Sequence, residues 1–223
     1  MNALLVDPPE LRLRTEGTLE LAARFWRLAD PTLVISSAPL GGGLGLRHWV
    51  CNAQVPHGYD GDDPKRDLVL LATEAGVSGP GAGMMTAVNV RTASIVRQEG
   101  VYVDATVGVS GPQWAAADDR FTEGPDEARA PGVGTINMVV ALPERLSDGA
   151  LVNAVGTATE AKAQALWEAG VMGTGTATDA LCILCPSDGP AHPYGGPRST
   201  WGSRLARAVR LAVLSGLPQP GHS

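Results

Sequence analysis

Residues 147–184 read SDGALVNAVGTATEAKAQALWEAGVMGTGTATDALCIL and contain the clearest helix signal of the chain. It predicts a helix from Asp148 to Ala169, capped at Ser147 or Asp148 and ended by a glycine. The helix is rich in Ala, Val and Leu on several sides, which indicates packing on more than one face. After a short glycine-containing loop, the apolar residues 178–184 predict a strand.

The rest of the chain also mixes helices with strands. Apolar residues at helical spacing predict a helix from Thr18 to Ala29, ended by Asp30-Pro31. A second helix is expected from Asp63-Pro64 to about Ala75, with Asp63 as its cap and Pro64 in its first turn. A last, basic amphipathic helix is predicted over residues 200–215. Further strands are predicted over residues 32–36, 49–55, 84–90, 101–107 and 135–142.

These elements favour one layered domain of the α/β (or α+β) class, with a mixed sheet or sheets packed by helices. No repeat or linker interrupts residues 1–223, so we expect a single domain that ends in a flexible tail over residues 216–223. The chain contains 28 glycines and 17 prolines, dispersed between apolar segments, which indicates many tight loops. The polar stretch 113–132 is predicted to be a surface loop.

The charge pattern argues against several classes of partner. The net charge is −6 and no long run of Lys or Arg is present, so we expect no nucleic-acid partner. No apolar run approaches the roughly 20 residues of a membrane span. The N-terminus carries acids and prolines and lacks a signal-peptide core, so we expect a cytoplasmic protein. The sequence does not define an oligomeric state.

Common catalytic motifs are missing from the sequence. It contains no Walker loop, no H-E-x-x-H and no G-x-S-x-G elbow, and the glycine cluster at 41–45 does not fit G-x-G-x-x-G. The histidines His48, His57 and His192 lack the spacing of metal ligands, so no metal site is predicted.

Two glycine-rich loops are candidates for ligand binding, one at residues 41–43 and one at residues 173–175. Such loops can present backbone N–H groups to a bulky ligand, and they equally suit plain turns. Ser36 and Ser37 end an apolar strand, where α/β proteins tend to place ligands. Substrate binding, nucleophilic attack and bonding to the local backbone all remain open for these two hydroxyls.

Three charged residues occur in apolar surroundings. Glu160 and Lys162 lie in the Ala-rich helix, where a charge is unusual unless it is paired or functional. Because residues two apart in a helix point in different directions, at most one of them needs to face a site. Asp179 opens an apolar strand just after Thr176, so it is either an acid or base or a carboxylate that caps its loop.

Six segments, in order along the chain, resemble the adenosylcobinamide amidohydrolase family. They are SSAPLGGG at 36–43, Asn52 with Val55, GMMTA at 83–87, GTIN at 134–137, ATEAK at 158–162 and TGTATD at 174–179. Together they are specific, and they span residues 36 to 179. The glycines at 195–196 and 202 extend the match weakly. The acidic stretch 113–129 is the main departure from the family pattern.

The resemblance implies hydrolysis of the amide that joins aminopropanol to the corrin's propionyl side chain. Adenosylcobinamide would become adenosylcobyric acid in cobalamin salvage, with no protein cofactor because the cobalt belongs to the corrinoid substrate. The alternative is a corrinoid-binding protein without catalysis. Direct attack by water and a covalent acyl-enzyme both remain open.

Family position and local chemistry together give the candidate site. The candidates for catalysis are Asp179, Glu160, Ser37 and Thr176. The candidates for substrate binding are Ser36, Gly41, Gly42, Gly43, Asn52, Thr86, Asn137, Lys162, Thr174 and Gly175. Asn52 and Asn137 suit either the amide groups of a corrin or buried hydrogen bonds at strand edges. We expect the loop at 174–179 to meet the loop at 36–43 around the scissile amide.

The chain has three cysteines, an odd number that argues against a disulfide framework. Cys182 and Cys185 form C-x-x-C within an apolar strand, where alternation of faces separates them. We interpret them as buried structural thiols.

Replacing Cys182 and Cys185 with Ala or Val is therefore expected to leave turnover of adenosylcobinamide unchanged and to cost some stability at most. Thermal melts and steady-state kinetics of the variants measure the two effects. Lost turnover in a variant that stays folded would contradict a purely structural role.

Overall fold

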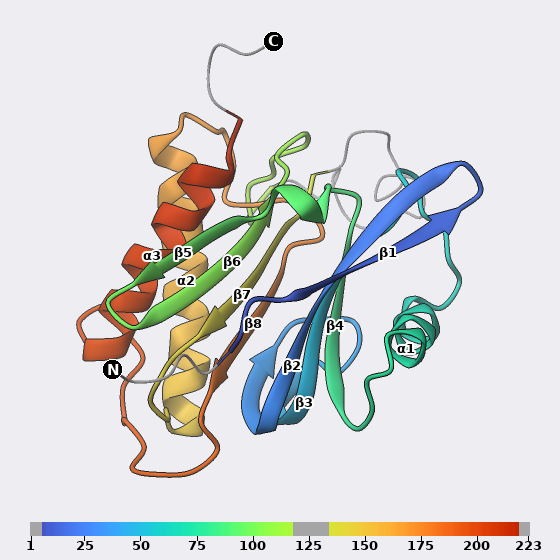
Figure 1. The fold of residues 1–223 in the computed structure, drawn as a ribbon. Helices are drawn as coiled ribbons and strands as arrows, with labels where there is room; N and C mark the ends of the chain where they lie inside the picture. The colour runs from blue at the N-terminus through green and yellow to red at the C-terminus, as the bar shows by residue number, and fades with distance from the viewer. Residues whose placement is uncertain (1–5, 118–133, 219–223) are drawn as a thin grey trace.

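A long, bent strand organises the sheet in the computed structural model, which describes residues 6–117 and 134–218 (Figure 1). This strand, β2 (Leu19–Ser36), pairs antiparallel with β3 (Gly43–Gln54) along most of its length. It pairs with β1 (Glu10–Glu16) through its first half and with β8 (Ala180–Cys185) through its last residues. The register between β2 and β3 shifts between Arg27 and Thr32. The other edge of β2 pairs with β1 before this irregularity and with β8 after it.

The complete sheet is mixed, as the sequence predicted. Its order is β4-β3-β2-β8-β7-β6-β5, with β1 added on β2. The remaining strands are β4 (Gly81–Thr86), β5 (Ser94–Gln98), β6 (Val101–Val107) and β7 (Ile136–Ala141), and a 3-10 turn spans Val90–Thr92. The pairs β3–β4 and β7–β8 are parallel, and the other pairs are antiparallel.

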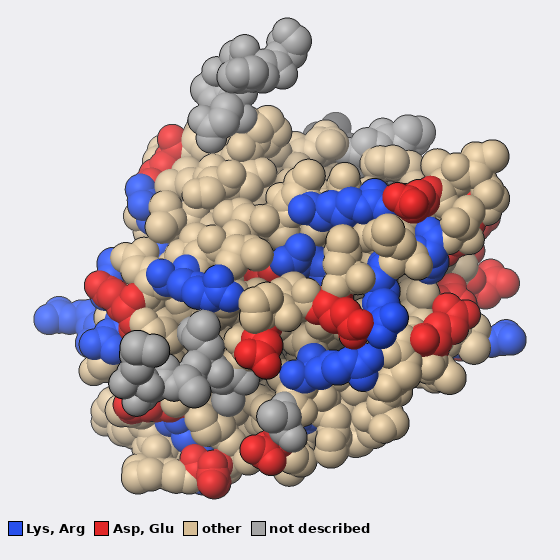
Figure 2. All heavy atoms as spheres, viewed as in Figure 1, with Lys and Arg blue, Asp and Glu red and all other residues tan. Residues whose placement is uncertain are grey.

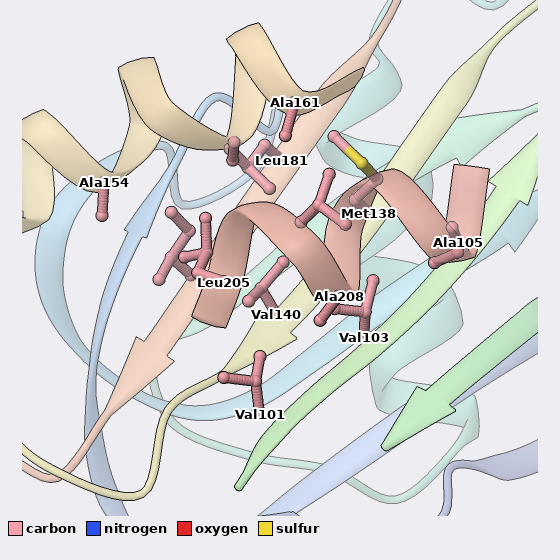
Figure 3. Packing of buried hydrophobic residues seen from close by; sticks show 14 of the residues in the cluster. Val101, Val103, Ala105, Met138, Val140, Ala154, Ala161, Leu181, Leu205 and Ala208 are labelled. Carbon is pink, nitrogen blue, oxygen red and sulfur yellow. The ribbon is translucent and has the colours of Figure 1, made fainter. Parts of the chain in front are cut away.

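Helices cover one face of this sheet. α2 (Asp148–Glu168) and α3 (Thr200–Gly216) lie side by side over β5 to β8, and α1 (Pro64–Glu74) packs near β3 and β4 (Figure 1). Ala208 of α3 lies beside Val103 and Val140, and Ala161 of α2 lies beside Leu181 (Figure 3). Because these helix residues are small, both helices approach the strands closely.

The other face of the sheet curls around its own apolar cluster. Trp26, Val50, Met84, Tyr102 and Val139 meet there, from five different strands. Strands that are not neighbours in the sheet thus share one interior. This curl brings side chains at the starts of β7 and β8 close to residues of β3 and β4.

The sequence predicted several helix boundaries correctly. The Asp63 carboxylate caps α1 by accepting from the Arg66 N–H at 3.0 Å, with Pro64 in the first turn. Of the two candidate caps for α2, the structure uses Ser147, whose hydroxyl accepts from the Ala150 N–H. Of the predicted tail, Gly216 still belongs to α3, and residues 219–223 lie outside the described residues, as do residues 118–132 of the predicted surface loop.

The predicted helix over Thr18–Ala29 is wrong, because residues 19–29 form the first part of β2. Ala23 and Phe25 face the cluster beneath α1, whereas Trp26 faces the interior of the curl. A strand buried on both faces gives a nearly continuous apolar run, which also satisfies helical spacing. The edge strands β1 and β5 were not predicted.

Cys182 and Cys185 are buried, as predicted, and lie on opposite faces of β8. Cys182 belongs to the interior cluster and Cys185 to the cluster beneath α2 and α3. Burial raises the pKa of the Cys182 thiol to about 12, although the Ser36 hydroxyl opposes this shift. The thiol therefore stays protonated near neutral pH.

The surface carries charges of both signs. Figure 2 shows Lys and Arg interspersed with Asp and Glu over one face of the molecule. Among the helices of the described ranges, none is both long and apolar enough to cross a membrane.

A buried ion pair links distant strands across the interior. The Arg24 guanidinium, on β2, donates to Asp104 Oδ2 on β6 at 2.5 Å, and the Tyr102 hydroxyl donates to the same oxygen at 3.1 Å. Their side chains are only 10% and 1% exposed for Arg24 and Asp104, respectively. Burial raises the pKa of the Asp104 carboxyl, and Arg24 opposes that shift. Removal of either partner would therefore leave the other charge buried without its counter-charge.

Arg24→Met is expected to lower the free energy of unfolding by about 3–5 kcal/mol, because it leaves the Asp104 carboxylate buried without its cation. The matched control is Arg12→Met, which removes an exposed partner of Glu10 and should cost less than about 1 kcal/mol. Urea denaturation of both variants measures the difference. Equal losses would show that the interior pair has no special role.

Candidate functional site

An ion pair between α2 and the loop before β8 forms the centre of the candidate site. The Lys162 ammonium contacts Asp179 Oδ2, and the Lys162 side chain is only 9% exposed. Lys162 follows the buried residues Ala158 and Ala161 along α2, so the same face that packs on the sheet delivers its ammonium group to the start of β8. The sequence placed these two residues in separate roles, and the structure joins them.

Asp179 also caps its own loop, one of the two roles that the sequence left open. Its Oδ1 accepts from the Ile136 N–H at 2.8 Å and from the Thr176 hydroxyl at 2.5 Å. Its Oδ2 accepts from the Thr176 N–H at 3.1 Å, in addition to Lys162. Four donors thus hold one carboxylate, and charge-assisted bonds of this kind fix its orientation strongly.

Gly175 lies directly against this ion pair. A Cβ atom at this position would collide with both Lys162 Nζ and Asp179 Oδ2. A side chain here would force one of these two charged groups to move, so glycine serves their close approach and not an unusual backbone angle.

An open depression of about 570 Å³ lies over the Lys162 side chain. Its wall contains Glu160 and Lys162 of α2, residues 174–177 of the loop, and parts of the segment 113–117. Both Glu160 and Lys162 line this depression, although their spacing on the helix predicts that at most one of them needs to face a site. The long Lys162 side chain reaches the buried floor, whereas Glu160 is exposed at the wall.

The segment 113–117 is fastened to the glycine loop. The Gln113 N–H donates to the Gly175 carbonyl at 2.8 Å, and the Thr174 N–H donates to the Gln113 carbonyl at 2.8 Å. The Thr174 hydroxyl accepts from the Ala115 N–H at 2.9 Å. Through these bonds, Thr174 and Gly175 hold the segment 113–117 in place as part of the wall of the depression.

Ser36 and Ser37 lie beside the first residues of β8. Ser37 exchanges two hydrogen bonds with Leu181: its N–H donates to the Leu181 carbonyl at 3.0 Å, and its hydroxyl accepts from the Leu181 N–H at 3.1 Å. Ser36 is buried; its hydroxyl accepts from the Ala38 N–H and lies 3.0 Å from Cys182 Sγ. The end of β2 therefore reaches the strand that begins just after Asp179.

Residues 41–43 form a tight turn that packs on β4. Leu40 exchanges backbone hydrogen bonds with Gly83, and the carbonyl of Gly41 accepts from Arg47. Gly41 has a φ of +68° and lies against the backbone of Gly81, so both its angle and its surroundings require glycine. The structure gives Gly41 a turn role, and Gly42 and Gly43 are exposed beside it.

Asn52 and Asn137 form a buried amide pair inside the curl. Asn137 Nδ2 donates to Asn52 Oδ1 and to the Met85 carbonyl, both at 2.9 Å. Asn52 Nδ2 donates to the Thr106 hydroxyl, and Asn137 Oδ1 accepts from the Ala180 N–H. The structure thus shows the buried hydrogen-bonding alternative, and these amides support the start of β8 next to Asp179.

Thr86 is likewise buried, and its hydroxyl accepts from the Val88 N–H at 3.0 Å. Trp114 also lines the depression and is not among the residues predicted from the sequence. It lies in the polar stretch that was predicted as a surface loop, and the only signal was a large aromatic residue among small and acidic ones.

In the described part of the chain, no three His, Cys, Asp or Glu side chains gather as metal ligands.

Comparison with known proteins identifies the family. The family model described as adenosylcobinamide amidohydrolase matches residues 10–222. The adenosylcobinamide amidohydrolase of Methanosarcina mazei is 30% identical over 212 residues, which cover 88% of this chain and 99% of that protein. The Halobacterium salinarum protein of the same name is 37% identical over 134 residues, 60% of this chain and 57% of that one.

Among solved structures, the crystal structure of the PH0078 protein from Pyrococcus horikoshii OT3 overlaps with a TM-score of 0.49 at 12% identity, covering 94% of this chain and 82% of that one. The sequence matches define an amidohydrolase. The chain belongs to the adenosylcobinamide amidohydrolase family, which confirms the resemblance carried by the six segments.

Gly175→Ala is expected to separate Lys162 from Asp179 and to lower the free energy of unfolding by roughly 3 kcal/mol, as for other broken buried ion pairs. The matched control is Gly156→Ala on α2, where a Cβ meets nothing within 4 Å. That variant should gain about 0.5–1 kcal/mol from helix propensity. Urea denaturation gives both values, and a neutral Gly175→Ala would contradict this geometry.

Proposed function

We propose that this protein hydrolyses the amide between aminopropanol and the propionyl arm of adenosylcobinamide, leaving adenosylcobyric acid. One observation carries the proposal: in a member of this family, a buried lysine–aspartate pair lies on the floor of an open depression whose wall also contains the Glu160 carboxylate. The cobalt belongs to the substrate, and the proposed steps use no protein cofactor. The cytoplasmic location expected from the sequence stays a prediction.

Lys162 is the proposed group for stabilising charge on the substrate. An ammonium group has three N–H donors, and Asp179 takes one of them. The remaining donors can reach the carbonyl oxygen of an amide lying in the depression. A preorganised donor at this position would stabilise the oxyanion of the tetrahedral intermediate.

Asp179 is proposed to position Lys162 and not to transfer protons. Its two oxygens already accept four hydrogen bonds, so a water molecule would have to displace one of these donors. The Thr176 hydroxyl donates to the same carboxylate and holds the glycine loop in place. These contacts favour direct attack by water over an acyl-enzyme formed at Thr176.

Glu160 is the proposed general base. Its exposed carboxylate lies in the same wall as Lys162, two residues earlier on α2. It would take a proton from water as the water oxygen bonds to the amide carbon. The same carboxyl would then give that proton to the aminopropanol nitrogen as the C–N bond breaks. Such proton transfers typically contribute about 10²–10⁴ in rate.

Glu160→Gln is therefore expected to lower kcat about 10²–10⁴-fold while the protein stays folded. The matched control is Glu168→Gln on the same helix, where the carboxylate pairs with Arg210 outside the depression, and its kcat should equal that of the wild type. Chromatographic assay of released aminopropanol, with circular dichroism for folding, measures both.

Three outcomes are informative. Wild-type turnover in Glu160→Gln would remove this carboxylate from the mechanism. Loss of turnover in Ser37→Ala, with a trapped acyl-enzyme in the wild type, would replace water attack by a covalent route. Tight binding of adenosylcobinamide without release of aminopropanol would make the wild-type protein a corrinoid binder.

A further inference from the structure

The volume of the depression limits which part of the substrate it can hold. Its volume of about 570 Å³ lies within the range of sites for drug-sized ligands. A corrinoid with its axial adenosyl group is much larger than such a ligand. The propionyl arm with its aminopropanol fits over Lys162, whereas the macrocycle must remain at the rim. A macrocycle placed there would lie against exposed residues of the lining.

We propose that Trp114 is a contact surface for the corrin macrocycle and helps to select corrinoids as substrates. This inference rests on the proposed function. Trp114 lines the same depression as Lys162 and Glu160, and it is 44% exposed. An exposed indole in the lining of a depression offers a bound ligand a large apolar face together with one N–H donor.

The backbone around Trp114 is held in place, which suits a binding surface. Its neighbours Gln113 and Ala115 bond to the glycine loop at 2.8 and 2.9 Å. Its own carbonyl accepts from the Ala117 N–H at 3.1 Å. The indole is therefore presented from a fastened turn. A rigid aromatic residue loses little conformational entropy when a ligand packs against it.

The chemistry of the indole matches a flat, conjugated ring edged with methyl groups. It offers a broad apolar face for packing and one N–H that can donate to an acetamide side chain of the corrin. The adjacent Ala115 and Ala117 are small, so they leave room for a wide ligand. The adenine of the adenosyl group is also flat, and the experiment must separate these two sources of contact.

The experiment compares binding of two ligands that both lack aminopropanol, adenosylcobyric acid and cyanocobyric acid, by equilibrium dialysis. Trp114→Ala should weaken both about tenfold, as for other truncated aromatic anchors, whereas Trp114→Phe should retain most of the affinity. The matched control is Trp167→Ala, which removes an indole that is 69% exposed on α2 but does not line the depression. It should bind both ligands like the wild type.

Kinetics with adenosylcobinamide complete the test, and we expect the Trp114→Ala defect mainly in KM. Wild-type affinity in Trp114→Ala would overturn the inference, and a loss confined to the adenosyl ligand would assign the contact to adenine instead. If the wild-type protein binds cobyric acids but releases no aminopropanol, the proposed function fails while the Trp114 comparison stands. If it cleaves the substrate and Trp114→Ala behaves like the wild type, only this inference fails.

Discussion

The buried ion pair between Lys162 and Asp179 imposes a strict condition on its surroundings. Removing two charges from water is costly, so the remaining hydrogen-bonding capacity of the carboxylate must be satisfied by nearby groups. Thr176 and the Ile136 N–H do so, and Gly175 leaves the space that the two charged groups need. The loop before β8 therefore takes a conformation that encloses this charge pair. Residues 174–177 of the same loop form part of the wall of the depression.

The interior of the sheet provides the support for this pair. Asn137 accepts from the Ala180 N–H, and Asp179 accepts from the Ile136 N–H, so the starts of β7 and β8 are cross-linked by reciprocal side-chain bonds. Asn137 is in turn bonded to Asn52 of β3 and to the Met85 carbonyl of β4. The residues of the family-like segments therefore fall into two groups. Some line the depression, and others lie in the interior of the sheet and hold the start of β8 in place.

Much of the fold could be predicted because local signals were strong. Asp63-Pro64 marks the start of α1, and the Ala-rich run marks α2. Residues 18–29 misled us because burial on both faces removes the alternation that identifies a strand. The sequence also drew attention to Asp179 and Lys162, but their pairing could not be read from spacing, since 17 residues and a chain reversal separate them. Trp114 could not be predicted as a site residue, because only the fold brings it into the same depression as Glu160 and Lys162.

The change of partner along β2 also has a consequence for the newly made chain. Ser36 lies beside Cys182, a residue 146 positions later in the sequence. During synthesis, the edge of β2 that receives β8 therefore has no strand to pair with until most of the protein has left the ribosome. Unpaired strand edges attract other chains, and contacts between distant residues form slowly. The same strand that joins the two halves of the sheet is thus open to pairing with another chain until β8 has been made.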